Sequence, residues 1–374
     1  MRKIIFWIHL VCGVITGVVI FSMSITGVIL TYERQINQWI AEGLYVPVSE
    51  QVNRLSLEQL NQIRKVEYPD IRASQIVLTN HPGAPVMFRA GRFDAISLNP
   101  YSGQAMNTES ESLSNFWTAI TRFHRWFGAE GESRDIARQV TGVSNLAFLF
   151  LVLSGLYLWL PTLFRWTMFK ARLLFRKNYP NNKVRDYHWH HIFGIWAAIP
   201  LIFIVYTGAM FNYEWTGDLI YSALGADRPV RGSAGDQPQN VPAVIANPLS
   251  LDSLVDQVLA DTGDDWNRLS ISLPGQSDER LRVDVDRGNG AQAQKRHTLS
   301  LDRSTGAIIE TRVYADLPVD SKIQGITRFG HTGEMYGFIG QTIAGLASLA
   351  ALFMVWTGFA LSWRRLIQPL MRKH

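Results

Sequence analysis

Cysteine is nearly absent from the sequence. Its 374 residues include one cysteine, Cys12, which excludes an internal disulfide framework and any metal site built from several cysteines. Cys12 lies inside a long apolar run, where packing is its expected role. The glycine pattern "GFIGQ" near Gly337 also lies in an apolar run and follows no strand, so it does not indicate a phosphate-binding loop.

Charged residues are scarce in four long stretches of the chain. These stretches are about Ile4–Tyr32, Val140–Leu163, His191–Asn212 and Met335–Trp363. Each is close to or above the ~20 residues that a helix needs to cross a ~30 Å hydrocarbon core. We therefore expect an integral membrane protein, mainly α-helical, with a bundle of four transmembrane helices. The first stretch is too long for a signal peptide and has no small-residue cleavage site, so it is expected to remain as a span.

Lysine and arginine concentrate in three short segments and predict the orientation of the spans. They are Arg2 and Lys3 at the N-terminus, Arg165, Lys170, Arg172, Arg176, Lys177, Lys183 and Arg185 between the second and third spans, and Arg364, Arg365, Arg372 and Lys373 at the C-terminus. The positive-inside rule makes these segments cytoplasmic, so both long connections are expected outside. The net charge of +5 follows from this bias, and no nucleic-acid partner is needed to explain it.

The two halves of the chain resemble each other, which predicts an internal duplication. An offset of 181 positions aligns His9 with His190, Gly13 with Gly194, Thr26-Gly27 with Thr207-Gly208, and Tyr32-Glu33 with Tyr213-Glu214. The second and fourth spans end in the related motifs "SGLYLWL" and "TGFALSW". Each half would then consist of a span, a small external module and a second span.

The external modules are expected to be α+β. In each, a helical pattern ("LSLEQL" or "LSLDSL") precedes short alternating strands and a turn that contains Gly103 or Gly306. The predicted division is span one at 1–32, module one at 33–125, span two with its external lead-in at 126–163, a basic cytoplasmic loop at 164–187, span three at 188–213, module two at 214–330, and span four with a basic cytoplasmic tail at 331–374.

Histidine is concentrated at the ends of the spans. His9, His188, His190 and His191 lie at the cytoplasmic ends, and His124 and His331 at the external ends. Any one of them is more simply interpreted as a solvated helix end. The repeat changes this interpretation, because His9 matches His190, and the tripeptide Thr-Arg-Phe precedes both outer histidines. His124 follows the tripeptide directly ("TRFH"), whereas one glycine separates it from His331 ("TRFGH"). Two histidines at each membrane face are what two bis-histidine haems would need, since neutral imidazole is a good iron ligand.

Neighbouring residues suit the same hypothesis. Gly13 and Gly194 would leave room for a porphyrin beside its ligand, although close helix packing explains them equally well. Arg122 and Arg328 would pair with haem propionates in a forked geometry, with headgroup contact as the alternative. No Cys, Asp or Glu cluster accompanies "HWHH", His188 to His191, so a zinc or copper site is not favoured.

The span sequences "HLVCG…SITGVILTYE" and "HHIFG…VYTGAMFNYE" resemble the transmembrane motif of the PepSY-associated membrane proteins, and the external modules resemble PepSY domains. Within that family, the arrangement is similar to the FoxB-type siderophore reductases of the bacterial inner membrane. This resemblance implies two non-covalent b-type haems and two periplasmic modules. By position, the inner haem would use His9 and His190, with His188 and His191 as alternatives, and the outer haem would use His124 and His331.

The resulting hypothesis is a haem-dependent oxidoreductase that carries electrons across the membrane, reduces the iron of a ferric siderophore in the periplasm and releases Fe(II) for uptake. A quinol or a cytoplasmic reductase would supply the electrons, because no cytoplasmic segment is long enough for a flavin or nicotinamide domain. Two alternatives remain. One is a non-enzymatic PepSY protein that binds or senses a periplasmic partner. The other is a siderophore or metal permease, against which the nearly uncharged spans argue.

Overall fold

The structure is a computed structural model that describes residues 1–48, 53–91, 94–107, 111–161, 165–228, 248–275 and 278–371. Arg372 and Lys373 of the basic tail lie outside these ranges. The chain divides into two compact units. The helical unit consists of Met1–Glu33, Ser112–Arg228 and Ile323–His374, and the sheet unit of Arg34–Glu111 and Pro229–Lys322.

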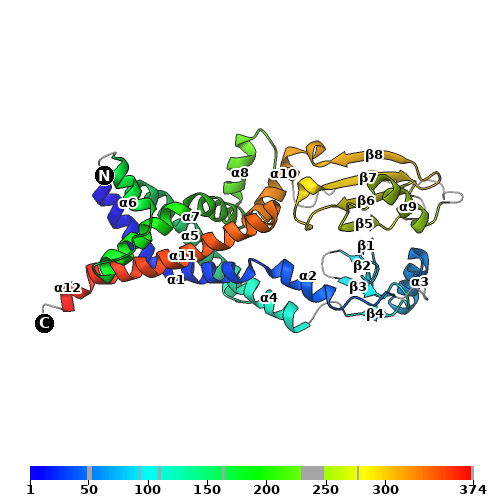
Figure 1. The fold of residues 1–374 in the computed structure, drawn as a ribbon, viewed down its shortest axis with the longest axis horizontal. Helices are drawn as coiled ribbons and strands as arrows, with labels where there is room; N and C mark the ends of the chain where they lie inside the picture. Colours follow the sequence, from blue (N-terminus) through cyan, green and yellow to red (C-terminus); the bar gives the residue numbers. More distant parts are fainter. Residues whose placement is uncertain are drawn as a thin grey trace. The chain divides into compact units, whose positions relative to one another are not determined.

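Four long helices build the helical unit (Figure 1). They are α1 (Arg2–Leu30), α5 (Ser133–Trp159), α7 (Asn182–Asn212) and α11 (Gly337–Leu366). All four are long and apolar enough to cross a membrane, which confirms the four predicted spans. α1 and α7 each pack against both α5 and α11, so α1 and α7 lie diagonally across the bundle.

The third span begins earlier than the predicted residue 188. The side chain of Asn181 accepts a hydrogen bond from the Val184 backbone N–H at 3.0 Å and caps a helix that starts at Asn182. Asparagine is among the best residues for this position because its side-chain oxygen satisfies an amide that has no partner within the helix. The same helix therefore carries both the basic residues Lys183 and Arg185 and the histidine cluster.

Shorter helices connect the spans. They are α4 (Glu111–Trp126), α6 (Trp166–Leu173), α8 (Glu214–Ala223), α10 (Val319–Gly325), a π-helix (Ile326–Gly330), a 3₁₀ turn (Glu334–Tyr336) and α12 (Gln368–Met371). The predicted modules at 33–125 and 214–330 both extend too far, because α4 and α8 belong to the helical unit. Side-chain contacts hold them there: His124 of α4 bonds to Thr26 of α1, and the Tyr206 hydroxyl of α7 donates to the Thr216 carbonyl of α8 at 2.8 Å.

One antiparallel sheet of eight strands forms the sheet unit. The strands are β1 (Gln75–Thr79), β2 (Val86–Ala90), β3 (Asp94–Leu98), β4 (Ala105–Met106), β5 (Arg268–Ser272), β6 (Arg280–Asp286), β7 (Arg296–Asp302) and β8 (Ile308–Val313). Their order is β4-β3-β2-β1-β5-β6-β7-β8, so each half supplies four consecutive strands. β1 and β5 join the two sets at the centre, with Val77 opposite Ser270. The two predicted modules therefore share one sheet.

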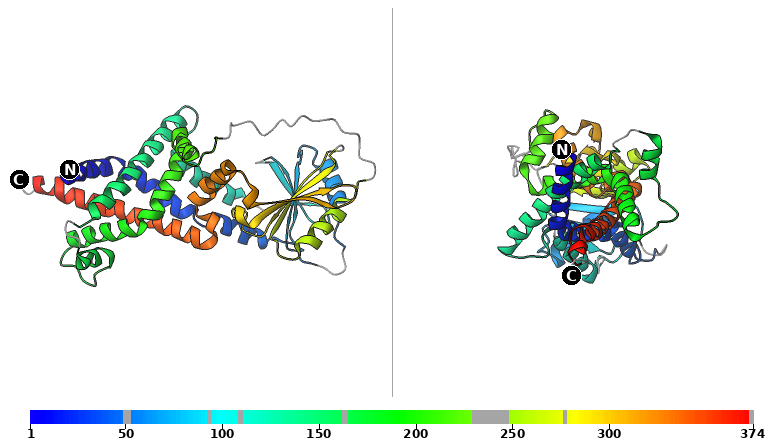
Figure 2. Two further views of the ribbon diagram at one scale, coloured as in Figure 1. Left: turned by 90° about the horizontal axis from the view of Figure 1, so that it is seen from above. Right: turned by 90° about the vertical axis from the view of Figure 1, so that its left-hand side faces the viewer.

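Two helices cover the same face of this sheet (Figure 2). α3 (Leu57–Glu67) and α9 (Leu251–Thr262) contribute Leu60 and Leu254 to one apolar core with alternate strand residues such as Ile76 and Ile271. The predicted helices after Leu55 and Leu249 are confirmed, as are six of the strands. β4 and β8 were not predicted. The sheet unit also contains α2 (Glu33–Glu42) and two 3₁₀ turns (Ala293–Lys295 and Tyr314–Asp316).

Each of these two helices caps the other. The Leu57 N–H at the start of α3 donates to the Asp252 carboxylate at 2.9 Å, and the Leu251 N–H at the start of α9 donates to the Glu58 carboxylate. Carboxylates are favourable at helix N-termini because free amides and the helix dipole both attract negative charge. Burial, assisted by the neighbouring Glu58, raises the pKa of Asp252 to about 6. The raised pKa of Asp252 shows that the two carboxylates at this junction repel each other when both are ionised.

Candidate functional site

Two histidines face each other inside the helical unit. His9 lies on α1 and His190 on α7, the two diagonal helices of the bundle. Their ring centres are 6.5 Å apart and their planes are inclined by 82°. Both rings are half-buried, so each keeps some surface that no protein atom covers. We call His9 and His190 the inner pair.

A hydroxyl from a neighbouring helix holds each ring of the inner pair. His9 Nδ1 lies 2.8 Å from Ser154 Oγ of α5, and His190 Nδ1 lies 3.0 Å from Thr357 Oγ1 of α11. Each hydroxyl already donates its one proton to a carbonyl of its own helix, at 2.7 Å in both cases. The imidazoles must therefore donate from Nδ1, and Nε2 is left with its lone pair.

The outer histidines, His124 and His331, have the same kind of partner. His124 Nδ1 lies 2.8 Å from Thr26 Oγ1 of α1, and His331 Nδ1 lies 3.1 Å from Thr207 Oγ1 of α7. Both threonine hydroxyls donate to carbonyls of their own helices, at 2.7 Å and 2.8 Å. His124 and His331, which we call the outer pair, therefore also present a free Nε2.

A π-helix absorbs the one-residue difference between "TRFH" and "TRFGH". His124 ends its motif on the α-helix α4, whereas the π-helix Ile326–Gly330 immediately precedes His331. A π-turn is the local consequence of one extra residue in a helix. The extra residue is Gly330, where a Cβ would come within 2.8 Å of Phe203 Cζ. Both histidines thus reach equivalent threonines despite the insertion.

Glycine follows every one of the four hydroxyl residues. A Cβ built on these glycines would contact the imidazole Cε1 of the adjacent histidine. The distances are 3.5 Å for Gly155 and His9, 3.6 Å for Gly358 and His190, 3.7 Å for Gly27 and His124, and 3.3 Å for Gly208 and His331. The dipeptide Ser/Thr-Gly therefore provides both the acceptor for Nδ1 and the space for the ring.

The separation of the inner pair would allow both imidazoles to bind one metal ion. Metal–imidazole bonds are about 2 Å and each ring centre lies about 1 Å beyond its nitrogen, so two imidazoles that bound the same metal would have ring centres up to about 6 Å apart. The observed separation of 6.5 Å agrees with this value. Within the described ranges, no three His, Cys, Asp or Glu side chains gather as they would around a metal held by protein alone.

The other two histidines of "HWHH" have different partners. Both nitrogens of His188 are engaged: Nε2 donates to the Ala171 carbonyl and Nδ1 accepts from the Tyr179 hydroxyl, each at 2.9 Å. His191 donates from Nδ1 to the Tyr187 carbonyl of its own helix at 2.8 Å. Neither side chain occupies the position of His190 opposite His9.

The glycines and arginines named in the sequence are more dispersed. A Cβ built on Gly13 would lie 3.7 Å from Leu151 Cδ2, and one built on Gly194 would lie 3.5 Å from Met354 Sδ, both on neighbouring spans, so close helix packing is compatible with both glycines. Arg122 forms an exposed ion pair with Glu130 at 2.9 Å, and Arg328 lies 5.6 Å from the ring of Phe329. The structure does not bring either arginine into contact with the outer pair.

Comparison with known families matches residues 6–365 to the PepSY-associated TM region. The chain belongs to this family. The match covers both pairs of histidines and all four hydroxyl residues that hold them. A search of curated proteins finds no match.

The four hydroxyl residues are the part of the candidate site that was not predicted from the sequence of this PepSY-associated protein. The sequence does repeat these residues: Thr26-Gly27 matches Thr207-Gly208, and "SGLYLWL" and "TGFALSW" begin with Ser154-Gly155 and Thr357-Gly358. This repetition does not by itself show that the hydroxyls contact histidines. The packing of α1 against α5 and of α7 against α11 brings Ser154 and Thr357 to the inner histidines. The contacts of Thr26 with His124 and of Thr207 with His331 do the same for the outer histidines.

Proposed function

We propose that this protein is a dihaem transmembrane electron-transfer protein that reduces ferric siderophore iron in the periplasm and releases Fe(II) for uptake. The observation that carries the proposal is the fourfold contact between a histidine Nδ1 and a Ser/Thr hydroxyl, with a free Nε2 on each ring. His9 and His190 would ligate the inner b-type haem, and His124 and His331 the outer one. We further propose that the two sets of contacts come from two repeats of one sequence.

The spacing of the histidines and threonines along the spans supports one haem near each face of the bilayer. On α1, His9 and Thr26 are separated by 17 positions, as are His190 and Thr207 on α7. At 1.5 Å per residue this is roughly 25 Å along each helix, close to the thickness of a hydrocarbon core. This spacing would place one pair of haem-ligating histidines near each face of the membrane.

Haem, when bound, supplies the one-electron Fe(III)/Fe(II) chemistry, and the chain supplies position and environment. The Ser/Thr hydroxyls fix the tautomer and the orientation of each imidazole. Between the stations, small apolar residues of α7 and α11 exclude water, and the buried ones are Ala197, Ala198, Leu201, Ala347, Ala350 and Ala351. Such a low-dielectric interior favours electron transfer over leakage of protons.

The sheet unit would lie in the periplasm and both termini in the cytoplasm of a bacterial inner membrane, as the positive-inside rule predicts. The sheet unit also offers a candidate substrate surface around Arg268. Partial desolvation by neighbouring side chains, together with repulsion from Arg34, Arg89 and Arg296, lowers the pKa of the exposed Arg268 despite the opposing Asp286. An anionic ligand would relieve the repulsion among these arginines, and many ferric chelates are anionic. We propose that the chelate docks there.

The test is the visible spectrum of the full chain in detergent, first oxidised and then reduced with dithionite. We expect low-spin b-type bands from two haems per chain, followed by reoxidation when a ferric siderophore is added. His297→Gln, in the sheet unit, is a matched control that should keep both haems. A folded but colourless protein would contradict the proposal and favour a PepSY protein that binds or senses a partner.

A further inference from the structure

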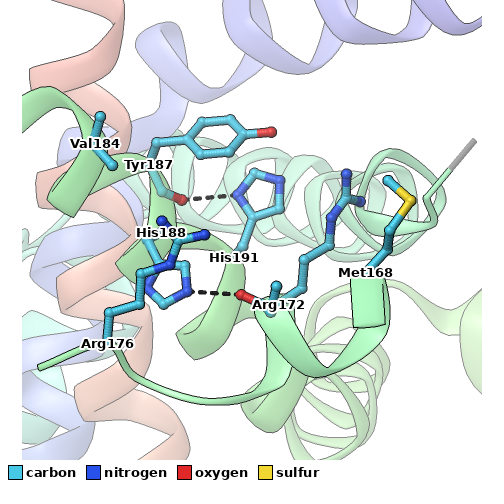
Figure 3. A pocket seen from close by; sticks show the side chains of 8 residues that line it. Met168, Arg172, Arg176, Val184, Tyr187, His188 and His191 are labelled. Carbon is cyan, nitrogen blue, oxygen red and sulfur yellow. Dashed lines mark hydrogen bonds between the residues drawn. The ribbon is translucent and has the colours of Figure 1, made fainter. Parts of the chain in front are cut away.

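A cavity lies between α6 and α7, next to the inner pair. Its volume is about 210 Å³, and Met168, Ala171, Arg172, Val184, Tyr187 and His191 are among the residues that line it. Figure 3 shows these side chains converging from the two helices. A cavity of about 150 Å³ can hold a benzene ring, so this one admits a single substituted ring.

The walls of this cavity are fixed by hydrogen bonds between α6 and α7. The His188 Nε2–H donates to the Ala171 carbonyl, and the Trp196 Nε1–H donates to the Leu173 carbonyl, both at 2.9 Å. The first of these bonds is drawn in Figure 3. Small-molecule sites are usually preformed in this way. The contacts between α6 and α7 therefore define the shape of the cavity before any ligand binds.

One polar atom of the lining has the right character to orient a ligand. Because His191 donates from Nδ1 to the Tyr187 carbonyl at 2.8 Å, its Nε2 carries a lone pair and can accept a hydrogen bond from a hydroxyl. The His191 ring centre is 6.5 Å from that of His190. A ligand bound to His191 would thus lie beside the proposed inner haem.

The surroundings of the cavity are apolar and accessible. Trp166 of α6 is 73% exposed, Trp196 of α7 is 67% exposed, and Phe175 is 56% exposed. Exposed tryptophans at the ends of spans are typical of the interfacial layer of a bilayer. A ligand dissolved in the membrane can reach the cavity at this depth, whereas a soluble protein would have to displace these side chains.

We propose that this cavity binds the head group of a membrane quinol and that the quinol is the electron donor. A hydroxyl of the quinol donates to His191 Nε2, while Met168 and Val184 contact the ring. A haem held by His9 and His190 would accept the electrons, so this inference rests on the proposed function. Oxidation of one quinol to quinone releases two electrons and two protons; the electrons leave one at a time toward His190 and reduce two ferric ions, and the protons pass to solvent.

The experiment is photolabelling of the full chain in nanodiscs with an azido-quinone, followed by peptide mapping. We expect the label in α6 or at the start of α7. Val184→Phe fills the cavity and should reduce labelling about tenfold, equivalent to about 1.4 kcal/mol of binding free energy. Val143→Phe makes the same change at a position on α5 that is 57% exposed, and it should label as the parent protein does.

The outcomes separate this inference from the proposed function. Equal labelling of Val184→Phe and Val143→Phe, or a label that maps elsewhere, would overturn the quinol site. Displacement by phosphatidylglycerol but not by unlabelled quinone would overturn it in favour of a lipid-headgroup site at Arg172 and Arg176. Labelling that depends on Val184 in a protein without haem would support the quinone site and refute the dihaem proposal.

Discussion

The two halves of the helical unit make the same contacts by different means. In the first half, His9 bonds to Ser154, and His124 reaches Thr26 from a regular α-helix. In the second half, His331 also contacts the Ile204 carbonyl at 2.9 Å, as His124 contacts the Met23 backbone in the first half. The inner histidines differ, because His190 contacts the Met354 carbonyl at 3.1 Å in addition to its hydroxyl, whereas the hydrogen bond of His9 is to Ser154. The contact between imidazole and hydroxyl is common to both halves, while the local backbone differs. This indicates that the position of the imidazole is the constrained quantity.

The largest expected effect comes from removing a histidine. His9→Ala and His190→Ala should each abolish the proposed inner haem and leave the proposed outer one, because either change removes one of the two proposed inner ligands. His331→Ala should do the reverse. Haem content and the reduced spectrum would measure this. If His9→Ala and His190→Ala retain different numbers of haems, the two halves do not share one inner site.

Removal of a hydroxyl should expose the difference between the halves. Ser154→Ala deprives His9 of its hydrogen-bond acceptor, so we expect haem affinity to fall about 10- to 100-fold, as for other residues that orient a ligating histidine. Thr357→Ala should cost less, because His190 keeps the Met354 carbonyl. Haem retention during dilution would rank the two variants, and Ser154→Thr should restore the affinity. An equal loss in both alanine variants would contradict the argument.

A methyl group beside the outer rings should have a smaller effect. A Cβ at Gly208 would lie 3.3 Å from His331 Cε1, whereas the Cβ at Gly27 would lie 3.7 Å from His124 Cε1. Gly208→Ala must displace the ring slightly, at a cost of about 1 kcal/mol, and Gly27→Ala should be close to neutral. The midpoint potential of the outer haem would report the displacement. A larger shift for Gly27→Ala would reverse the predicted order.

The smallest expected effect concerns the junction of α3 and α9 in the sheet unit. Because the pKa of Asp252 in the folded protein, about 6, is above its ordinary value, its contribution to stability is fully present below pH 4 and is lost as the pH rises through 6. Asp252→Asn keeps an acceptor for Leu57 and should remove this pH dependence. Proteolysis of the full chain in urea at pH 5 and pH 7.5 would measure it. An unchanged pH dependence in the variant would assign the effect to another group.

Local patterns accounted for much of the fold. The four spans were predictable because apolar length alone identifies them, and α3 and α9 because "LSLEQL" and "LSLDSL" are helical patterns; in the structure Ser56 and Ser250 cap these helices. The shared sheet was not predictable, since the pairing of β1 with β5 depends on residues far apart in the chain. β4 and β8 were missed for a different reason: β4 has two residues, and β8 is almost wholly exposed and has no buried alternation.

Sequence also predicted the histidines of the candidate site but could not choose among His188, His190 and His191. The choice depends on which face of α7 meets α1 across the bundle, and the structure places His190 there. The role of Ser154 and Thr357 could not be deduced either, because a Ser/Thr-Gly dipeptide in a span is equally compatible with helix packing.

The central strand pair of the sheet has a consequence for biosynthesis. β1 ends at Thr79 and its partner β5 begins at Arg268, so about 190 residues must be synthesised between them, which takes about 10–40 s at 5–20 residues per second. During that interval β1 is an unpaired edge strand, a state prone to aggregation. The nascent first half therefore needs protection, from a chaperone or from a neighbouring surface, until the ribosome has delivered the second.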